Sequence, residues 1–245
     1  MRITVLTIFP ELFEGFHAFP LVKRALENGS LELVITDMRA YADGSYRHID
    51  DSPYGGGAGM ILRYPVMARA LADVRSAKSH TVLFAASGHP YTQKDARRFA
   101  ESEDLILVCG HYEGIDARIL DDIDEEISVG DYVLSGGELP AMTVIDSIVR
   151  LLDGTIRTVS TEEESFENGL LEYPQYTRPA SWNGRDVPAV LLSGNHEQIR
   201  LWRKKESLKR TLLYRPDLLE KYPLSAEESR MLAEVRAELN GKDKK

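Results

Sequence analysis

Short apolar runs alternate with amphipathic stretches along the chain as far as residue 152. Short runs rich in Val, Ile and Leu are typical of strands buried on both faces, and apolar positions three or four residues apart are typical of helices. The predicted strands are 3–8, 30–38, 80–86, 105–110 and a short one near 126–129. The predicted helices are 20–29, 65–77, 92–102, 115–123 and 139–152. This alternation predicts an α/β fold on a parallel sheet that helices cover on both faces.

The pattern changes near Asp153, which marks a boundary between domains. Residues 153–179 are acidic and polar without a helical or strand period, which is typical of a mobile linker. Two more helices are predicted beyond it, at 195–214 and 224–239. The expected division is an α/β domain at 1–157, a flexible acidic linker at 158–175 and a small helical domain at 176–245.

Capping residues indicate where three of the helices begin or end. Gly29 follows the first helix, as glycine commonly does at a helix C-terminus. Asn195 is a candidate N-cap for the helix that follows it, and Ser225 with Glu228 forms a capping box for the last helix. These signals support the element boundaries independently of the hydrophobic pattern.

The composition is that of a protein with a buried core and without a membrane span or an intrachain disulfide. Hydrophobic residues make up 43% of the 245 residues, which is enough for a buried core. No apolar run approaches the ~20 residues that a membrane span needs, and the N-terminal run meets Pro10 and Glu11 instead of a cleavage site. The single cysteine, Cys109, excludes an intrachain disulfide and is expected in the core. We therefore expect a cytoplasmic protein that does not bind a membrane.

The net charge of −9 argues against a nucleic-acid partner, because phosphate contacts need Lys and Arg. The segment 200–215 departs from this balance. It carries seven Lys and Arg against one Glu, which gives it a net charge of +6. Local clustering matters more than the total, so this predicted helix is a candidate nucleic-acid surface.

Three turns follow neighbouring predicted strands, at the edge where parallel sheets bind ligands. They are SGHP (87–90), GHYEG (110–114) and VGDYVLSGGE (129–138). They contain no Lys or Arg, but carry Glu113, Asp131 and Glu138, which argues against a polyphosphate. An acidic, glycine-rich pocket suits a cationic ligand without phosphate, such as S-adenosylmethionine. The alternative is that these glycines only make tight turns.

Five long motifs stand in order along nearly the whole chain. They are DDSPYGGGAGM (50–60), LILVCGHYEGID (105–116), SVGDYVLSGGELPAM (128–142), GLLEYPQYTRP (169–179) and VLLSGNHEQIRLWR (190–203). Together they closely resemble the bacterial, TrmD-like tRNA (guanine-N1)-methyltransferase family of the SPOUT superfamily. The resemblance implies a deep trefoil knot in the α/β domain and S-adenosylmethionine as the methyl donor. It also implies methylation of N1 of guanine 37 in tRNA, next to the anticodon, by a homodimer with its active site at the subunit interface.

The resemblance implies which residues bind the methyl donor, largely through main-chain groups of the three turns. Carried over to this chain, these positions are Gly88, Gly110, Tyr112, Glu113, Ser128, Val129, Gly130, Tyr132, Leu134, Gly136 and Gly137. Glu113 is expected near the cationic part of the ligand. For the side chains of Tyr132 and Leu134, plain core packing is the alternative.

Methylation of guanine N1 needs a base, because this nitrogen is protonated at neutral pH. Loss of its proton moves negative charge toward O6, so a carboxylate at N1 and a cation at O6 are the expected groups. The resemblance implies Glu164 as the base, where the family often has Asp, and Arg150 as the cation. Glu163 is an alternative base, and a solvated acidic run at 162–164 is the alternative without a catalytic role.

The resemblance also implies contacts with the tRNA. Residues 43–60 are predicted to form a loop, and its glycine-rich part DDSPYGGGAGM (50–60) is expected to face the guanine, with a plain surface loop as the alternative. The basic helix is expected to anchor the tRNA. The candidate substrate-binding residues are Arg47, Asp50, Gly59, Arg203, Lys204 and Lys205. Trp202 is expected to pack within the small domain rather than stack on a base.

The sequence also bears on metal binding and on two other functions. The six histidines show no metal-ligand spacing, so no zinc site is predicted. The resemblance implies a requirement for Mg²⁺, but no residue is identified as its ligand. A non-catalytic RNA-binding protein of the same fold would show eroded glycine turns, which are not seen. A ribose 2′-O-methyltransferase would not need the carboxylate at Glu164.

Overall fold

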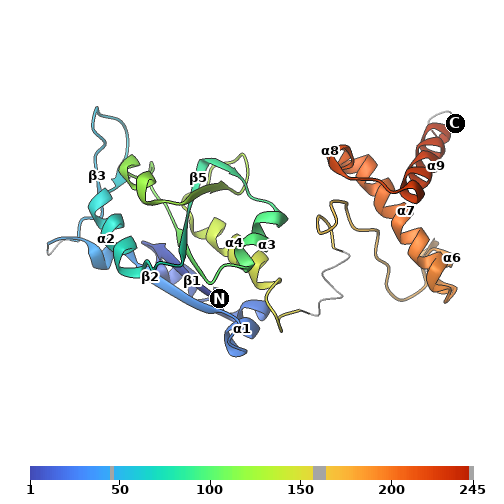
Figure 1. Ribbon diagram of the computed structural model, residues 1–245, viewed down its shortest axis with the longest axis horizontal. Coiled ribbons are helices and arrows are strands. Elements are labelled where there is room, and N and C mark those ends of the chain that lie inside the picture. The colour runs from blue at the N-terminus through green and yellow to red at the C-terminus, as the bar shows by residue number, and fades with distance from the viewer. Residues whose placement is uncertain (45–46, 157–163, 243–245) are drawn as a thin grey trace. The chain divides into compact units, whose positions relative to one another are not determined.

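The computed structural model of the protein describes residues 1–44, 47–156 and 164–242. The chain forms two compact units, Met1–Arg157 and Thr158–Lys245. Each unit has its own hydrophobic core, and Figure 1 shows a sheet with helices in the first and a group of helices in the second. Within the described ranges, none of the helices is long and apolar enough to cross a membrane.

The first unit is built on a five-stranded sheet with the order β2-β1-β6-β5-β7. Its strands are β1 (Arg2–Thr7), β2 (Glu32–Asp37), β5 (Ser79–Pro90), β6 (Asp104–Val108) and β7 (Glu125–Ser128). Every neighbouring pair is parallel, which confirms the sheet predicted from the alternation of strands and helices. The carboxyl ends of all five strands therefore lie at one edge.

Helices cover both faces of this sheet. They are α1 (Pro20–Glu27), α2 (Tyr64–Val74), α3 (Gln93–Ala100) and α4 (Glu138–Val149), with the short 3-10 helices η1 (Pro10–Phe13), η2 (Phe16–Ala18), η3 (Met38–Tyr41) and η4 (Ala117–Asp122). Strand residues such as Ile3 and Val5 point into a core shared with α1, α3 and α4. Leu6 and Ile106 point into a second core shared with α2, η3 and η4. The alternation of side chains along each strand thus fills two layers.

One predicted α-helix is a 3-10 helix. The segment predicted as α-helix at 115–123 contains η4, a six-residue 3-10 helix. Asp116 precedes it and accepts a hydrogen bond from the backbone N–H of Arg118 at 3.1 Å. The helix ends at Asp122, just before β7 begins at Glu125.

Strand β5 is longer than predicted because SGHP is not a simple turn. Phe84 pairs with Ile127 of β7, the register then shifts, and pairing resumes with His89 opposite the same Ile127. Gly88 allows this close approach, since a Cβ there would lie 2.5 Å from the Ile127 backbone. The segment is therefore a bulged extension of the strand, a common reason for glycine inside a strand.

The glycine-rich loop predicted at 43–60 contains part of a small hairpin. Strand β3 (Asp50–Asp51) pairs in antiparallel fashion with β4 (Ile61–Leu62). The glycines between them lie at the tip, and Gly55, Gly56 and Gly59 have positive φ. The hairpin thus gives the glycine-rich segment two fixed ends.

The second unit consists mainly of helices. Its elements are the hairpin β8 (Ser181–Trp182) and β9 (Arg185–Asp186), and the helices α6 (Ala189–Leu192), α7 (His196–Tyr214), α8 (Pro216–Lys221) and α9 (Ala226–Lys242). Its core joins Leu208 of α7 and Leu232 of α9 to Leu170. The long helices α7 and α9 pack against each other, as Figure 1 shows.

The capping signals read from the sequence are confirmed. Gly29 follows α1 with φ of +76°. The Asn195 side chain accepts a hydrogen bond from the Gln198 N–H at 3.1 Å at the start of α7. Ser225 and Glu228 bond reciprocally before α9, at 2.8 and 3.2 Å. Each bond satisfies a backbone group that the helix itself leaves unpaired.

Part of the acidic segment packs against α7, whereas composition alone suggested a mobile linker. The Leu171 N–H donates to Thr211 Oγ1 at 3.0 Å, and Ser207 Oγ donates to the Leu171 carbonyl at 2.5 Å. Leu170 is only 5% exposed. Residues 164–173 therefore belong to the fold of the second unit, while 157–163 lie outside the described residues.

Candidate active site

A cavity of about 340 Å³ lies at the carboxyl edge of the sheet in the first unit. It is lined by residues 84–86 of β5, 110–115 after β6, and 127–130, 132–137 and 140 around the loop that leads from β7 into α4. Three chain segments that are far apart in the sequence thus meet at one place. This is the edge at which parallel α/β sheets bind their ligands.

Ten of the eleven residues expected to bind the methyl donor line this cavity. They are Gly110, Tyr112, Glu113, Ser128, Val129, Gly130, Tyr132, Leu134, Gly136 and Gly137. The eleventh, Gly88, is not among the lining residues and lies where β5 meets β7. Phe84, Ala85 and Ala86 line the cavity instead. Sequence reasoning missed these three, although they end the apolar run just before the expected turn.

Main-chain groups form much of the cavity wall. The Gly137 N–H donates to the Gly110 carbonyl at 2.9 Å, which joins the turn after β6 to the start of α4. A Cβ on Gly137 would lie 2.6 Å from Cys109 Cα, so only glycine fits there. The turn after β6 and the start of α4 are thereby joined, and both line the cavity.

A buried carboxylate lies next to these turns. Glu138 begins α4 and is 3% exposed. Its Oε1 accepts a hydrogen bond from Thr7 Oγ1 at 2.8 Å, and its Oε2 lies 3.7 Å from His111 Nδ1. The helix N-terminus favours a negative charge at this position. Burial, together with this charge, raises the pKa of the Cys109 thiol well above its usual value. Cys109 is therefore a protonated core residue, as predicted.

Glu113 is the single carboxylate among the described residues that line the cavity. Its backbone N–H donates to the Met60 carbonyl at 3.1 Å, and its side chain occupies the space that a Cβ on Gly59 would need. The tip of the β3–β4 hairpin, which includes the expected substrate contact Gly59, is thus held against the cavity wall. Asp50 in β3 and Arg47, with φ of 44°, are not among the lining residues.

The two residues expected to be catalytic lie in different units. Arg150 is the half-buried C-cap residue of α4 and does not line the cavity of the first unit. Glu164 belongs to the second unit, where it lines another cavity of about 440 Å³ with Arg203 and Lys204. The alternative base, Glu163, lies outside the described residues.

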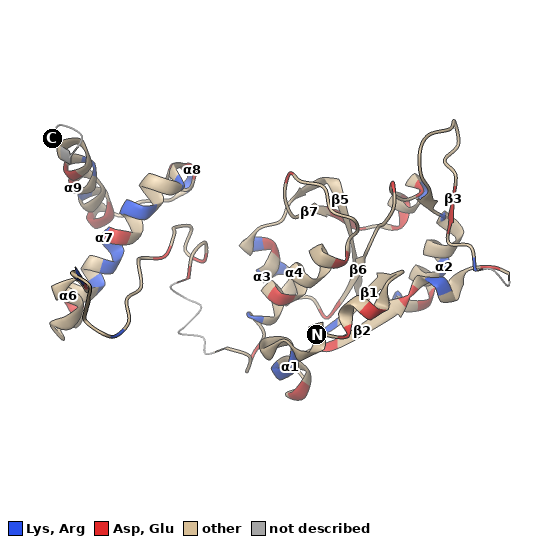
Figure 2. Cartoon of the chain, turned by 180° about the vertical axis from the view of Figure 1, so that it is seen from behind, with Lys and Arg blue, Asp and Glu red and all other residues tan. Residues whose placement is uncertain are grey.

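Two of the basic residues expected to bind tRNA form ion pairs within the second unit. Lys204 Nζ lies 2.8 Å from Glu228 Oε1, and Lys205 Nζ lies 2.9 Å from oxygens of both Glu234 and Glu238. Figure 2 marks basic residues along α7 and acidic residues on α9 by colour. The charge of +6 counted over residues 200–215 is therefore partly neutralised by the helix packed against α7. These lysines hold α7 to α9.

Two aromatic residues of the segment before α6 meet side chains of α7. The guanidinium carbon of Arg203 lies 4.7 Å from the centre of the Tyr173 ring. Tyr176 and Trp202 lie with ring centres 6.3 Å apart, and Trp202 is half-buried, as expected for a packing role. The third expected tRNA contact, Arg203, is thus stacked on a ring of its own unit.

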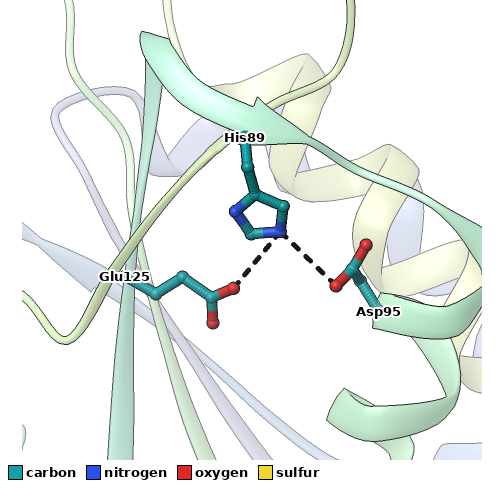
Figure 3. A group of neighbouring side chains, drawn as sticks. All are labelled: His89, Asp95 and Glu125. Carbon is teal, nitrogen blue, oxygen red and sulfur yellow. Dashed lines mark hydrogen bonds and ion pairs between the residues drawn. The ribbon is translucent and has the colours of Figure 1, made fainter.

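One group among the described side chains has the spacing of metal ligands: His89, Asp95 and Glu125. His89 Nε2 lies 3.4 Å from an oxygen of each carboxylate, as Figure 3 shows. Arg98 donates to the same two oxygens, at 3.1 and 2.6 Å. Although burial opposes it, hydrogen bonds from Arg98 and His80 lower the pKa of Glu125. Arg98 already supplies the cation, so we assign no metal to this ion-pair network.

Comparison with known proteins identifies the family. A family model described as tRNA (Guanine-1)-methyltransferase TrmD matches residues 1–221. A tRNA (guanine-N(1)-)-methyltransferase from Moorella thermoacetica is 49% identical over 96% of both chains. Proteins of the same name from Dictyoglomus turgidum and Geobacillus kaustophilus are 45% and 47% identical, over at least 97% of each chain. The chain is therefore a methyltransferase that belongs to the tRNA (guanine-1)-methyltransferase family.

Proposed function

We propose that this protein transfers a methyl group from S-adenosylmethionine to N1 of guanine 37 in tRNA, next to the anticodon. The observation that carries the proposal is the cavity at the carboxyl edge of the sheet, walled by the main chain of Gly110, Gly136 and Gly137. It occurs in a chain that belongs to a family of tRNA guanine methyltransferases. The family membership supports the substrate, and the cavity supports the methyl donor.

The cavity fits S-adenosylmethionine in size and charge. Its volume of about 340 Å³ lies in the range of small-molecule sites. No Lys or Arg occurs among the described lining residues, so a polyphosphate would stay unneutralised there, whereas Glu113 offers a negative charge to a cationic ligand. When bound, S-adenosylmethionine supplies an electrophilic methyl group. We place the adenine against the glycine backbone and the charged end toward Glu113.

The chain's own residues would supply the proton chemistry. Glu164 would accept the proton of guanine N1, which leaves this nitrogen nucleophilic. Arg150 would stabilise the negative charge that then develops on O6. General base catalysis contributes about 10²–10⁴-fold, and one well-placed donor at a developing charge contributes about 10²–10³-fold. We assign no ligands to Mg²⁺, and Arg98 already neutralises the described group with metal-like spacing.

We further propose that two chains form a homodimer with shared sites. Large apolar side chains are exposed around the cavity: Val133 is 98%, Tyr132 62% and Leu139 60% exposed. Such clusters commonly mark protein interfaces. Glu164 belongs to a different unit from the cavity. A second copy that covers the apolar residues could bring its own Glu164 to the bound methyl donor, and each site would then combine two chains.

The experiment that tests the function uses S-adenosylmethionine with a labelled methyl group and tRNA transcripts that carry G or A at position 37. We expect label only in the G37 transcript, and mass spectrometry of the digested RNA should identify 1-methylguanosine. Label on a ribose would support the 2′-O-methyltransferase. Binding of tRNA without any transfer would support the non-catalytic alternative.

A further inference from the structure

Two pairs of arginine and aromatic side chains gather at the C-terminal end of α7. The guanidinium carbon of Arg210 lies 6.0 Å from the centre of the Tyr214 ring, and that of Arg215 lies 5.8 Å from the centre of the Phe166 ring. Tyr214 and Arg215 are neighbours in the chain, which places both pairs at the same end of the helix. We call Phe166, Arg210, Tyr214 and Arg215 the stacking surface.

The two rings are not part of the hydrophobic core. Tyr214 is 68% and Phe166 45% exposed, and neither belongs to the cluster around Leu208. Phe166 has φ of +74°, which a bulky residue rarely adopts. Its N–H donates to the Leu170 carbonyl at 2.8 Å, which fixes this turn. The fold thus presents an aromatic ring to solvent from a strained backbone, a combination that often marks a functional position.

The two arginines of this surface do not pair with the described carboxylates of α9, unlike Lys204 and Lys205. Arg215 donates two hydrogen bonds to Asp217, at 2.9 and 2.8 Å, which fix the plane of its guanidinium. Arg210 is exposed and makes no ion pair with any carboxylate that the structure describes. The surface therefore combines two exposed rings, one oriented guanidinium and one cation that is available to a phosphate.

We propose that the stacking surface binds unpaired RNA bases next to the guanine that is methylated, an inference that rests on the proposed function. Aromatic rings stack on any base, and arginine adds cation–π and phosphate attraction. Phe166 is two residues from Glu164, so at most about 7 Å of chain separates them. A base stacked on Phe166 therefore belongs to a nucleotide that flanks the guanine deprotonated by Glu164.

Matched substitutions test the role of the rings. Phe166→Leu and Tyr214→Leu keep an apolar side chain but remove the aromatic face, whereas Phe166→Tyr and Tyr214→Phe retain it. Stacking on one base contributes about 1–3 kcal/mol, so we expect each Leu variant to bind tRNA about 5- to 150-fold more weakly. The aromatic variants should bind within about twofold of wild type, and the affinity for S-adenosylmethionine should not change in any of them. Trp182→Leu, at an exposed aromatic residue of β8, is the matched control and should bind tRNA normally.

A second experiment identifies the nucleotide. The affinities of wild type and of Phe166→Leu would be measured for anticodon stem-loops with an abasic site directly before or after the guanine. On the RNA that lacks the stacked base, Phe166→Leu should not weaken binding any further, because the abasic site and the substitution remove the same interaction. An equal loss on every RNA, or tRNA affinity of the Leu variants equal to that of wild type, would overturn the stacking surface. A changed oligomeric mass with unchanged RNA affinity would also overturn it and would indicate a protein interface.

The same measurements separate this inference from the proposed function. Methyl transfer by the wild-type protein to the guanine of tRNA tests the function alone. If wild type does not transfer the methyl group, the proposed function fails, whatever the variants do. If wild type does so and the Leu variants behave like it in binding and single-turnover rate, only the stacking surface fails.

Discussion

Two side chains, Glu164 and Arg150, carry the proposed chemistry at the scale of single residues. We expect Glu164→Gln to slow methyl transfer by about 10²–10⁴-fold, because an amide cannot take the proton from N1. Arg150→Ala should slow it by about 10²–10³-fold through loss of the cation at O6. Neither residue lines the cavity of the first unit, so the affinity for S-adenosylmethionine should stay close to that of wild type. Calorimetry and single-turnover kinetics measure the two quantities separately.

Glu164→Asp is the matched control, since it keeps the carboxylate and shortens the side chain by one methylene. It should retain much more activity than Glu164→Gln. A Glu164→Gln enzyme that transfers methyl groups at nearly the wild-type rate would remove Glu164 from the mechanism, and Glu163 would become the residue to test.

Individual residues could be predicted from the sequence where the signal is local. Glycines such as Gly110 and Gly137 stand out because turns between strand and helix need close backbone approach, and both line the cavity. Gly88 has the same appearance in the sequence, but its place depends on how β5 shifts against β7. The pairing of Lys204 with Glu228 joins residues of two different helices, and a charge count along one helix cannot detect it.

At the scale of elements, the bulged end of β5 predicts a stability defect. Gly88→Ala would place a Cβ 2.5 Å from the Ile127 backbone, so the strands must move apart. We expect a loss of about 1–3 kcal/mol in the free energy of unfolding, measured by urea denaturation. Gly15→Ala is the control, because its φ is −72° and no atom lies within 4 Å of the added Cβ. It should be neutral or stabilising by up to about 1 kcal/mol.

The same variant distinguishes the two roles of Gly88. If the close approach to β7 is what requires glycine, Gly88→Ala should lower the free energy of unfolding. The folded variant should still bind S-adenosylmethionine with wild-type affinity. Unchanged stability with weakened binding would instead show that Gly88 contacts the methyl donor.

The contact between α7 and α9 predicts a pH dependence of stability. Glu228 is 6% exposed and accepts hydrogen bonds from Lys204, Tyr222 and the Ser225 N–H, each at 2.8 Å. Burial acts to raise its pKa, but these donors lower it from 4.5 to about 2. Because the folded pKa is lower than the unfolded one, the ionised carboxylate stabilises the fold above pH 4.5, and this contribution disappears as the pH falls toward 2.

We therefore expect Glu228→Gln to lower the free energy of unfolding by about 1–3 kcal/mol at pH 7. The difference from wild type should shrink steadily between pH 4.5 and about 2. Urea unfolding followed by circular dichroism across this range measures it. Glu197→Gln, on the exposed face of α7, is the control and should change stability little at any pH. A Glu228→Gln deficit that persists unchanged at the acid limit would contradict this account.

Elements with a strong local pattern could be predicted well, and those shaped by their neighbours could not. Strands β1, β2 and β6 and helices α4, α7 and α9 follow from apolar periodicity and caps. The extension of β5 and the docking of residues 164–173 on α7 depend on partners distant in the sequence. For the same reason, a charge reversal at Lys204 and Lys205 would separate α7 from α9 and would not test tRNA binding alone.

At the scale of the whole molecule, the shared-site model predicts rescue between two inactive variants. Leu134→Arg would place a cation and extra volume in the cavity of one chain, and Glu164→Gln would remove the base of the other. Each homodimer should be inactive. In a mixed dimer, one site would combine an intact cavity with an intact Glu164, so about half the wild-type activity per dimer should return. Co-expression with two purification tags, followed by the methyl-transfer assay, measures this.

The substitution Leu134→Arg suits this test better than a change at Gly137. A side chain at Gly137 would collide with the Cys109 backbone and disturb the fold, whereas Leu134 is 39% exposed on a loop. A verified mixed dimer without activity would contradict the shared site, unless the wild-type dimer itself proves to use one site at a time. Transfer measured with limiting S-adenosylmethionine, which counts active sites per dimer, separates these outcomes.

The ion pairs of Lys204 and Lys205 bear on how the enzyme behaves among many competing RNAs. A bare row of lysines gains affinity from every phosphate backbone by releasing counterions, and would be sequestered by abundant duplexes. Here those ammonium groups are already matched by carboxylates of α9, in a chain of net charge −9. We therefore expect the affinity for helical RNA to fall less steeply with salt than the charge of residues 200–215 alone would give, so that abundant duplexes compete less with the tRNA.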